Sequence, residues 1–286
     1  MTTPFLLIGN SGMLGTAFER LLTHNALPYT PLDFPAFDLT NPAHTAAAIT
    51  PGVRYVINCA AWTDVDGAET KEDAATAVNA TGVRLLADHC ASVGATLITY
   101  STDYVFSGVA TSPYTTTQPR APLNAYGRSK ARGEELLEQS AARWYNIRTS
   151  WLYAPWGKNF VKTIAGLLTT KPSIKVVSDQ QGRPTSAEHL AATTLRLLDV
   201  DAEPGTWHVT DGGECTWFEF AKEIGAILAA KGAKVGEVLP CTSDEFPRPA
   251  KRPAYSVLDI AQTENATGKM PLWQANLVDV VKRLGV

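Results

Sequence analysis

Short apolar runs alternate with longer, helix-like segments along the first half of the chain. Residues 5–8 are all apolar, as in a strand that is buried on both faces of a parallel sheet. Further runs of this kind cover 29–32, 55–60 and 96–100, and segments with helical spacing follow over about 16–25 and 69–93. This alternation, with connections long enough for crossovers, predicts a Rossmann-type α/β fold with a doubly wound parallel sheet over residues 1–150.

The pattern becomes mixed in the second half, where aromatic and turn-forming residues interrupt it. Strands are predicted at 144–148, 174–177 and 205–209, and helices at 186–199, 216–231 and 274–284. The stretch 240–256 holds four prolines and is not expected to form a regular helix. We therefore predict a smaller C-terminal substrate-binding domain over 151–286, with the chain returning to the first domain near 186–210 and 254–262.

A glycine-rich turn separates the first predicted strand from the first predicted helix. Gly9, Gly12 and Gly15 are spaced three residues apart, which differs from the commoner G-x-G-x-x-G. Glycines at such a place allow a tight turn, the approach of the backbone to a pyrophosphate, and close packing of helix on strand. The helix N-terminus offers free N–H groups to the anion. The turn predicts a dinucleotide site, and a purely structural turn is the alternative.

Two aspartates follow this turn. Asp33 closes the second predicted strand, where a carboxylate can accept hydrogen bonds from the adenosine ribose hydroxyls. This interpretation favours NADH over NADPH, because a 2′-phosphate would meet a like charge. In the alternative, Asp33 opens a turn before Phe34 and Pro35. Asp38 has an alternative as a capping residue, because it lies just ahead of a predicted helix.

Tyr126 and Lys130 are four residues apart at the start of a helix-like segment, so they share one face. A phenol has an unperturbed pKa of about 10, and a nearby cation lowers it by favouring the phenolate. The pair is therefore a candidate proton donor near neutral pH. Because the pattern is common by chance, the alternative is that Tyr126 packs on a neighbouring element and Lys130 is a solvated charge.

The composition excludes several classes of protein. The chain has 286 residues and a net charge of −3, which argues against binding to a nucleic-acid backbone. The four cysteines are widely spaced and match no zinc pattern, which favours reduced thiols in a cytoplasmic protein. The start of the chain shows no leader pattern, and no apolar run reaches the roughly 18 residues of a membrane span. We expect no partner of either kind, nucleic acid or membrane.

Several segments combine into a longer match. They are YSTDYVFSG, PLNAYGRSKARGE, IRTSWLYAPWGKNFVKT, VVSDQQGRPTSAEHLA and PRPAKRPAYSVL. Together with the glycine turn, they resemble the dTDP-4-dehydrorhamnose reductase family of extended short-chain dehydrogenases/reductases, from Ile8 to about Leu258. The resemblance implies an NAD(P)H-dependent oxidoreductase that makes the last step of dTDP-L-rhamnose synthesis.

The resemblance also implies roles for individual residues. Tyr126 would protonate the C4 oxygen of the sugar, and Lys130 would bind the nicotinamide ribose and depress the Tyr126 pKa. Thr102, where the superfamily commonly has Ser, would fix and polarise the carbonyl. Positions that match the family's contacts to NADPH or NADH are Gly12, Met13, Leu14, Asp33, Asp38, Leu39, Ala61, Trp62, Thr63 and Tyr100.

The substrate side is implied in the same way, and each residue keeps an alternative. Asp103 and Trp151 match sugar-contacting positions, but Asp103 could form an Asx turn and Trp151 could pack between the domains. Thr102 could cap the turn after its strand. Arg252, with Arg248, is a candidate for the diphosphate of the nucleotide sugar, for which guanidinium groups suit the geometry, or else a solvated loop charge. Asn159 is placed on the nucleotide side.

One departure from the family concerns assembly. Some members dimerise through a magnesium ion held by glutamates; Glu188 stands at one such position, but Ala17 occupies another. A hard cation needs several oxygen ligands, so we expect no metal site and a monomer. Two other functions stay open: a reductase of another nucleotide-linked 4-keto-deoxysugar, and a non-catalytic regulatory subunit of the methionine adenosyltransferase type.

Overall fold

Six parallel strands form the central sheet of the structure, a computed structural model that describes residues 4–285. The order across the sheet is β10-β5-β4-β3-β1-β2, and every neighbouring pair is parallel. The strands are β1 (Phe5–Ile8), β2 (Tyr29–Leu32), β3 (Tyr55–Asn58), β4 (Thr96–Thr102), β5 (Arg143–Thr149) and β10 (Gly205–His208). The predicted doubly wound α/β class is confirmed.

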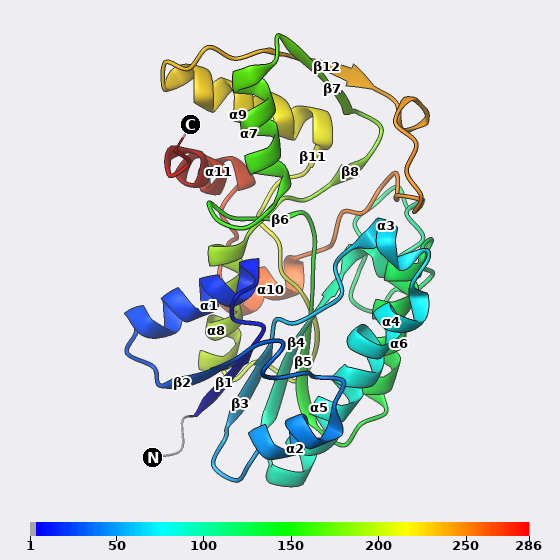
Figure 1. Cartoon of the computed structure of the whole chain (residues 1–286), viewed down its shortest axis with the longest axis vertical. Helices are drawn as coiled ribbons and strands as arrows, with labels where there is room; N and C mark the ends of the chain where they lie inside the picture. The colour runs from blue at the N-terminus through cyan, green and yellow to red at the C-terminus, as the bar shows by residue number, and fades with distance from the viewer. Residues whose placement is uncertain (1–3, 286) are drawn as a thin grey trace.

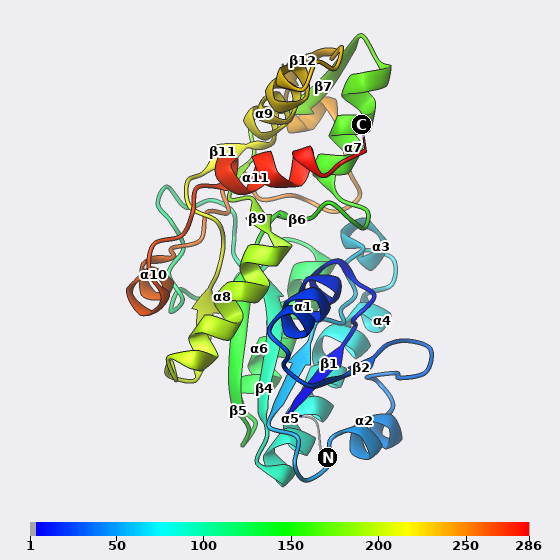
Figure 2. The ribbon, with the colours of Figure 1, turned by 90° about the vertical axis from the view of Figure 1, so that its left-hand side faces the viewer.

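Helices cover both faces of this sheet, which explains why its strands are so apolar. Leu7 of β1 enters one buried cluster, while Leu6 and Ile8 enter another on the opposite face. Figures 1 and 2 show the layers. The first face is covered by α1 (Met13–His24) and α8 (Ala187–Asp199), and the second by α2 (Pro42–Ala48), α5 (Gly82–Val93) and α6 (Ala125–Glu138).

The order of the strands creates a switch point between β1 and β3. The chain runs from β1 to β2 on one side of it, and then crosses back to β3 on the other side. In open parallel sheets, ligands bind in the crevice beyond the carboxyl ends of the strands at such a point. The glycine turn follows β1 directly, so it lies at this crevice.

A second body sits above the carboxyl ends of the sheet, at the top of Figure 1. Its buried cluster comes mainly from three helices, α7 (Phe160–Thr170), α9 (Trp217–Ala230) and α11 (Trp273–Lys282). Short strand pairs flank them: β6 (Leu152–Tyr153), β7 (Ser173–Val177), β8 (Gln181–Gly182), β9 (Thr185–Ser186), β11 (Cys215–Thr216) and β12 (Glu237–Cys241). The domain boundary near residue 150 stays a prediction.

Some local elements differ from the sequence pattern. The segment predicted as one helix over 69–93 contains α4 (Glu72–Thr76), the π-helix η1 (Ala77–Thr81) and α5, with α3 (Val65–Ala68) just before them. The helices α7 and α10 (Ala261–Thr267) were not predicted. The proline-rich stretch holds the end of β12 and the 3-10 turn η3 (Ser243–Glu245). None of the helices within residues 4–285 is long and apolar enough to cross a membrane.

Candidate active site

The glycine turn is fitted to the loop after β3. Gly9 has a φ of +78°, a region that favours glycine, and a Cβ added there would lie 2.6 Å from the backbone nitrogen of Ala60. A Cβ on Gly15 would lie 2.0 Å from the carbonyl oxygen of Gly9. The turn and the first helix therefore approach each other more closely than a side chain allows.

The N-terminus of α1 is open to an external anion. Its capping position is Gly12, so no side chain caps it, and its first turn holds no acidic residue. Gly12 is exposed, and Met13 is partly exposed. Free N–H groups and the positive end of the helix dipole suit a phosphate group. The site therefore fits the pyrophosphate of a dinucleotide.

Asp33 is bound to the same turn. Its Oδ2 accepts a hydrogen bond of 2.8 Å from the Ser11 N–H, and its Oδ1 accepts one of 2.8 Å from the Phe34 N–H. The carboxylate thus ties the end of β2 to the glycine turn and also opens the turn that follows. Each carboxylate oxygen has a second lone pair, so the ribose interpretation and the turn interpretation are compatible.

Asp38 serves a local turn. Its Oδ1 accepts hydrogen bonds from the N–H (2.9 Å) and the hydroxyl (2.7 Å) of Thr40, and these bonds lower its pKa. The capping residue of α2 is Asn41, whose side chain accepts from Ala43 N. The alternative that Asp38 caps the helix is wrong, because the helix begins four residues later. Leu39 is buried against α5, where a Cβ on Gly82 would meet its side chain.

The loop of Ala61, Trp62 and Thr63 is held by a residue that the sequence analysis missed. The side chain of Asn79, in the π-helix η1, accepts a 2.9 Å bond from Trp62 N–H and donates a 3.1 Å bond to Trp62 carbonyl oxygen. It also donates a 2.9 Å bond to the Ser129 hydroxyl in α6. Asn79 therefore joins the predicted cofactor loop to the helix that carries Tyr126 and Lys130. No pattern in the sequence indicates it, because residues 69–93 have the spacing of one continuous helix.

The start of α6 is fixed from several directions. Asn124 is its capping residue: its Oδ1 accepts from Gly127 N–H at 2.8 Å, and its Nδ2 donates to the carbonyl oxygen of Lys251 at 2.8 Å. The N–H of Ala125 donates to Glu69 Oε1 at 2.8 Å. Tyr126 therefore enters the first helical turn with a defined position.

Tyr126 and Lys130 share one face of α6, as predicted. Lys130 is only 7% exposed, and its ammonium donates a 3.0 Å hydrogen bond to the carbonyl oxygen of Tyr100 in β4. The Tyr100 side chain points elsewhere, with its hydroxyl 3.0 Å from that of Thr194. Burial lowers the pKa of Lys130 to about 8, although the nearby Glu134 carboxylate acts in the opposite direction.

The pKa of Tyr126 is not lowered by Lys130 in this structure. Burial and the charge of Asp103 raise the pKa of Tyr126, and a hydrogen bond with Thr102 acts against them. The Lys130 ammonium is instead directed at a backbone carbonyl and is itself disfavoured by burial, so the expected depression of the Tyr126 pKa by Lys130 stays a prediction. The ring of Tyr104, a further residue that the sequence analysis missed, stands edge-on to Tyr126 with centroids 6.0 Å apart.

Thr102 and Asp103 lie together at the end of β4. The Thr102 hydroxyl donates to Asp103 Oδ1 at 2.9 Å and accepts from the Tyr104 N–H at 3.1 Å, so the capping alternative for Thr102 is also present. Asp103 is 2% exposed, and burial raises its pKa to about 6. Thr102 and Asp103 both lie close enough to Tyr126 to affect its pKa, so three predicted residues come together in one group.

The predicted substrate residues are already engaged with other parts of the protein. The Trp151 ring stacks on Trp217 at 3.6 Å, and the Gly182 backbone lies against the same indole. Asn159 caps α7: it accepts from Lys162 N–H at 3.1 Å and donates to two carbonyl oxygens at 2.9 and 3.2 Å. These contacts support packing for Trp151 and capping for Asn159.

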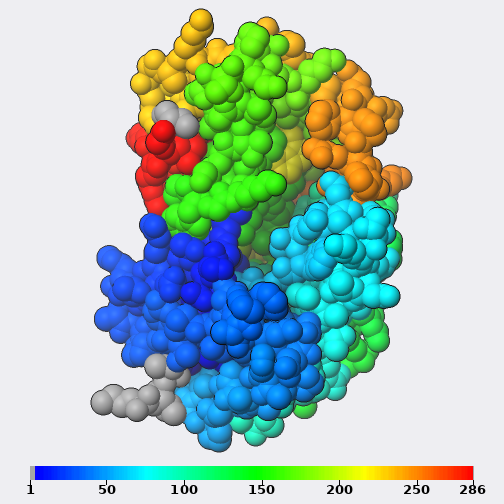
Figure 3. All heavy atoms as spheres, in the orientation of Figure 1, coloured from blue at the N-terminus to red at the C-terminus, as the bar shows by residue number. Residues whose placement is uncertain are grey.

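Arg252 is paired across the two bodies. Its Nη1 donates to Asp66 Oδ1 at 2.7 Å and to the carbonyl oxygen of Ala250 at 2.6 Å. Arg248 is more exposed, with its Nη1 4.0 Å from Asp66 Oδ2 and its guanidinium over the ring of Phe246. Figure 3 shows a hollow where the orange segment around residues 248–252 and the green α7 region face the cyan α3 and α4.

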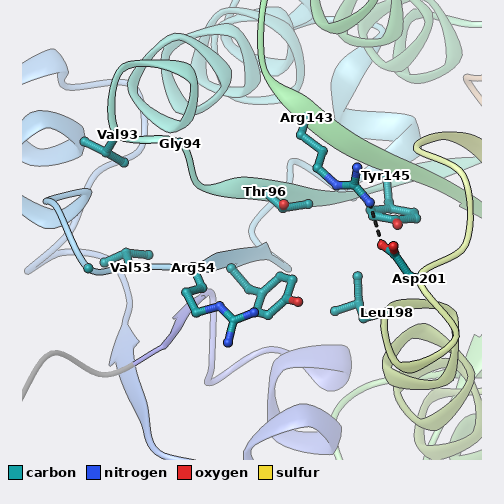
Figure 4. A pocket seen from close by; sticks show the side chains of 11 residues that line it. Val53, Arg54, Val93, Gly94, Thr96, Arg143, Tyr145, Leu198 and Asp201 are labelled. Carbon is teal, nitrogen blue, oxygen red and sulfur yellow. Dashed lines mark hydrogen bonds and ion pairs between the residues drawn. The ribbon is translucent and has the colours of Figure 1, made fainter.

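A second hollow lies away from this group. A cavity of about 470 Å³ opens at the amino ends of the strands, where Arg54, Arg143 and Tyr145 line it and Arg143 pairs with Asp201 at 2.8 Å (Figure 4). Parallel sheets bind ligands at the opposite, carboxyl edge. The volume alone therefore does not indicate the active site.

Glu188, at the position of a metal-binding glutamate in the dimeric family members, has a partner within the chain. Glu188 forms a double ion pair with Arg283, with distances of 2.6 and 3.1 Å between nitrogen and oxygen. Arg283 also contacts Asp279 at 3.0 Å. Within residues 4–285, no three Cys, His, Asp or Glu side chains converge as a metal-binding group.

The parallel sheet, the glycine turn at its switch point and the Thr102, Tyr126 and Lys130 group define an extended short-chain dehydrogenase/reductase. The family model described as the RmlD substrate binding domain matches residues 3–286, and the chain belongs to this family. A dTDP-4-dehydrorhamnose reductase of Streptomyces griseus is 40% identical, over 96% of this chain and 92% of that protein.

Two further relatives bear on the chemistry. A protein of Streptomyces antibioticus, described as a probable dTDP-4,6-dihydroxy-2-methyloxan-3-one 4-ketoreductase, is 39% identical over 96% of this chain and 92% of its own length. The crystal structure of a Bacillus anthracis dTDP-4-dehydrorhamnose reductase in complex with NADP is 35% identical, with a TM-score of 0.90 over 98% of this chain and 99% of that chain.

Proposed function

We propose that the protein reduces the C4 ketone of dTDP-4-dehydro-β-L-rhamnose to dTDP-β-L-rhamnose, with NADPH or NADH as the reductant. The observation that carries this proposal is the group formed by Thr102, Tyr126 and Lys130 at the carboxyl end of β4, beside a helix N-terminus that can hold a dinucleotide. The named reductases among the relatives, which match over nearly their whole length, supply the substrate class.

The chain's own residues divide the work of the reaction. Tyr126 donates its proton to the C4 oxygen, while the Thr102 hydroxyl binds the same oxygen and polarises the carbonyl. Positioned proton transfer of this kind is typically worth about 10²–10⁴-fold in rate. Lys130 holds the nicotinamide ribose and favours the phenolate that Tyr126 becomes. A bound nicotinamide cofactor supplies the hydride.

The cofactor is held by the glycine turn and its neighbours. The first turn of α1 binds the pyrophosphate, and Asp33 reaches the adenosine ribose from the end of β2. The loop of Ala61, Trp62 and Thr63, which Asn79 fixes, lies along the cofactor. The carboxylate of Asp33 supports NADH, whereas the relative with bound NADP supports NADPH, so both cofactors belong to the proposal.

The direct test measures oxidation of NADPH or NADH at 340 nm. The 4-keto sugar is generated in place by the upstream dehydratase and epimerase, and the product is identified as dTDP-L-rhamnose by mass spectrometry and NMR. We expect turnover that depends on all components. Binding of the cofactor without turnover of this substrate would contradict the proposed reaction.

A second candidate is a reductase for another nucleotide-linked 4-keto-deoxysugar. The Streptomyces antibioticus relative favours it, because its described substrate class differs at the sugar. Comparing kcat/KM for a series of dTDP-4-keto sugars would distinguish the two. A binding protein of the regulatory type would bind the cofactor but reduce none of them.

Two further observations bear on the cellular location and the assembly state of the protein. The four cysteines are free thiols, and both the cofactor and the nucleotide sugar are cytoplasmic metabolites, which supports a cytoplasmic enzyme. The ion pair between Glu188 and Arg283 supports a monomer without a metal bridge. A mass from sedimentation that shows a dimer dissociated by EDTA would contradict this assembly.

A further inference from the structure

The face of α6 that carries Tyr126 and Lys130 continues to a third ionisable residue. Glu134 lies four residues after Lys130 and eight after Tyr126, so the three side chains follow one line along the helix. Glu134 is 3% exposed and Lys130 is 7% exposed. A buried carboxylate one turn from a buried ammonium is costly unless both charges are compensated.

The Glu134 carboxylate is held firmly by the strand beside the helix. Arg148 in β5 donates from Nε to Oε1 at 2.9 Å and from Nη2 to Oε2 at 2.6 Å. Arg120 adds a 3.1 Å contact to Oε2. Burial opposes ionisation of Glu134, but Arg148 outweighs it and lowers the pKa of Glu134 to about 2. The carboxylate is therefore charged throughout the working pH range.

We propose that Glu134, fixed by Arg148, is a positioning residue that keeps Lys130 charged in its buried place beside Tyr126. Burial removes water from the ammonium, and the Tyr100 carbonyl supplies only a dipole. Glu134, one turn further along α6 from Tyr126, supplies a negative charge, which its ion pair with Arg148 offsets only in part. Its effect on Lys130 is to raise the pKa, against the larger effect of burial.

Several other charged groups on the elements packed against α6 have partners of their own. Asp66 on α3 pairs with Arg252, Glu72 on α4 with Arg128, and Arg84 on α5 with Asp88. On β4 and the 3-10 turn η2 (Asp103–Val105), the titratable groups are Tyr100, Asp103 and Tyr104, and Asp103 accepts a hydrogen bond from the Thr102 hydroxyl. On β5, Arg148 pairs with Glu134 itself, and Arg143 pairs with Asp201. Among these groups, Glu134 is the anion placed to act on Lys130.

The simplest other role for Glu134 is structural, as the partner that neutralises Arg148. Both roles predict that loss of the carboxylate weakens the fold, because a buried Arg148 would lose its counter-charge. Only the positioning role predicts a change in the protonation of Lys130. The test therefore has to measure Lys130 itself.

The experiment titrates Lys130 by ¹³C NMR in protein labelled at lysine Cε, with the resonance assigned by Lys130→Arg. In Glu134→Gln we expect the pKa of Lys130 to fall by about one unit from its wild-type value. The matched control is Glu138→Gln, which removes the exposed carboxylate one turn further along and paired with Arg120. We expect it to leave Lys130 unchanged.

A second variant protects the test against loss of folding. In Glu134→Gln/Arg148→Met neither charge is left unpaired. The pKa of Lys130 should still lie below the wild-type value, but by less than in Glu134→Gln, because the opposing charge of Arg148 is lost together with the carboxylate. An unchanged Lys130 pKa in the folded variants, or an equal fall in Glu138→Gln, would overturn the proposal.

The effect of Glu134 on the Lys130 pKa matters for turnover only if the proposed function holds, so this part of the inference rests on that function. In the reductase assay, the basic limb of the kcat/KM profile should move to lower pH in Glu134→Gln, because Lys130 loses its proton earlier. The NMR titration needs no substrate. A shift of Lys130 without any reductase activity would therefore contradict the proposed function alone, and activity with an unshifted Lys130 would contradict this inference alone.

Discussion

The cofactor side and the substrate side of the proposed site differ in how their polar groups are engaged. On the cofactor side, the N-terminus of α1 has no capping side chain, and Lys130 uses one of its three donors on the Tyr100 carbonyl. On the substrate side, Asn159 caps a helix and Arg252 is paired with Asp66. A cofactor can bind to open groups, whereas a nucleotide sugar has to compete with existing partners.

This difference has a consequence for affinity. Exchanging Asp66 for a diphosphate replaces one charge-assisted interaction of Arg252 with another, so the net gain is smaller than the new contact alone suggests. Binding of an anion to the open N–H groups of α1 displaces only water and breaks no interaction within the protein. We therefore expect most of the side-chain rearrangement to occur on the substrate side. The four predictions below test this comparison, beginning with the largest effect.

Replacing Tyr126 by Phe removes the proposed proton donor and leaves the ring in place. We expect kcat to fall by about 10²–10⁴-fold, the usual contribution of positioned proton transfer. The dissociation constant for NADPH, measured by fluorescence titration, should change little, because the cofactor side is otherwise intact. Near wild-type turnover would show that another group donates the proton.

Replacing Gly15 by Ala tests the fit of the cofactor side itself. The added Cβ would lie 2.0 Å from the Gly9 carbonyl oxygen, so the turn has to move. We expect a loss of about 1–3 kcal/mol in the free energy of unfolding, together with weaker NADPH binding. The control is Gly166→Ala in α7, where a Cβ meets nothing within 4 Å. Equal stability in both variants would refute the close fit.

Two substitutions distinguish a substrate-binding role, proposed for Arg252, from a helix-capping role, observed for Asn159. Arg252→Ala should raise the KM for the nucleotide sugar about tenfold, with kcat and the NADPH dissociation constant nearly unchanged. Asn159→Ala should instead cost about 1 kcal/mol in unfolding free energy through the lost cap. Steady-state kinetics and thermal unfolding on both variants make the comparison. A larger KM effect in Asn159→Ala than in Arg252→Ala would reverse our assignment.

The smallest effect is expected at Asp33. Asp33→Asn keeps an acceptor for Ser11 N–H but removes the charge that would repel a 2′-phosphate. We expect the ratio of kcat/KM for NADPH to that for NADH to rise a few-fold. Both cofactors are assayed at the same sugar concentration. A wild-type preference above tenfold for NADPH would already contradict the role given to Asp33.

Periodicity and motif context predicted the fold and the residues of the candidate catalytic group. Buried strands of apolar residues, a glycine turn after the first of them and the i, i+4 spacing of Tyr126 and Lys130 are local signals, and the structure has each element in its expected place. The Tyr126 pKa was not accessible in this way. Its direction depends on Asp103 and on burial, which arise only when β4 and α6 pack together.

On the substrate side, the roles of individual residues could not be predicted from the sequence, for a different reason. Asn159 and Trp151 are residue types that suit sugar binding. The sequence does not distinguish a sugar-binding Asn from one that caps a helix, or a sugar-binding Trp from one that stacks on another ring. Asn79, Glu134 and Arg148 were missed because their partners lie on other elements, from 14 to 50 residues away. Such pairings depend on the crossovers of the sheet, which spacing alone does not reveal.

One side chain connects the two sides that this comparison separates. Asn124 sets the start of α6 through its oxygen and holds the carbonyl of Lys251 through its nitrogen, with both bonds at 2.8 Å. If the 248–252 segment shifts to receive a diphosphate, this amide must either follow the segment or release it. In the first case Tyr126 is displaced, and in the second the segment becomes free. As long as Asn124 keeps its hydrogen bond to Lys251, arrival of the sugar nucleotide and alignment of the proposed proton donor are mechanically linked events under the proposed function.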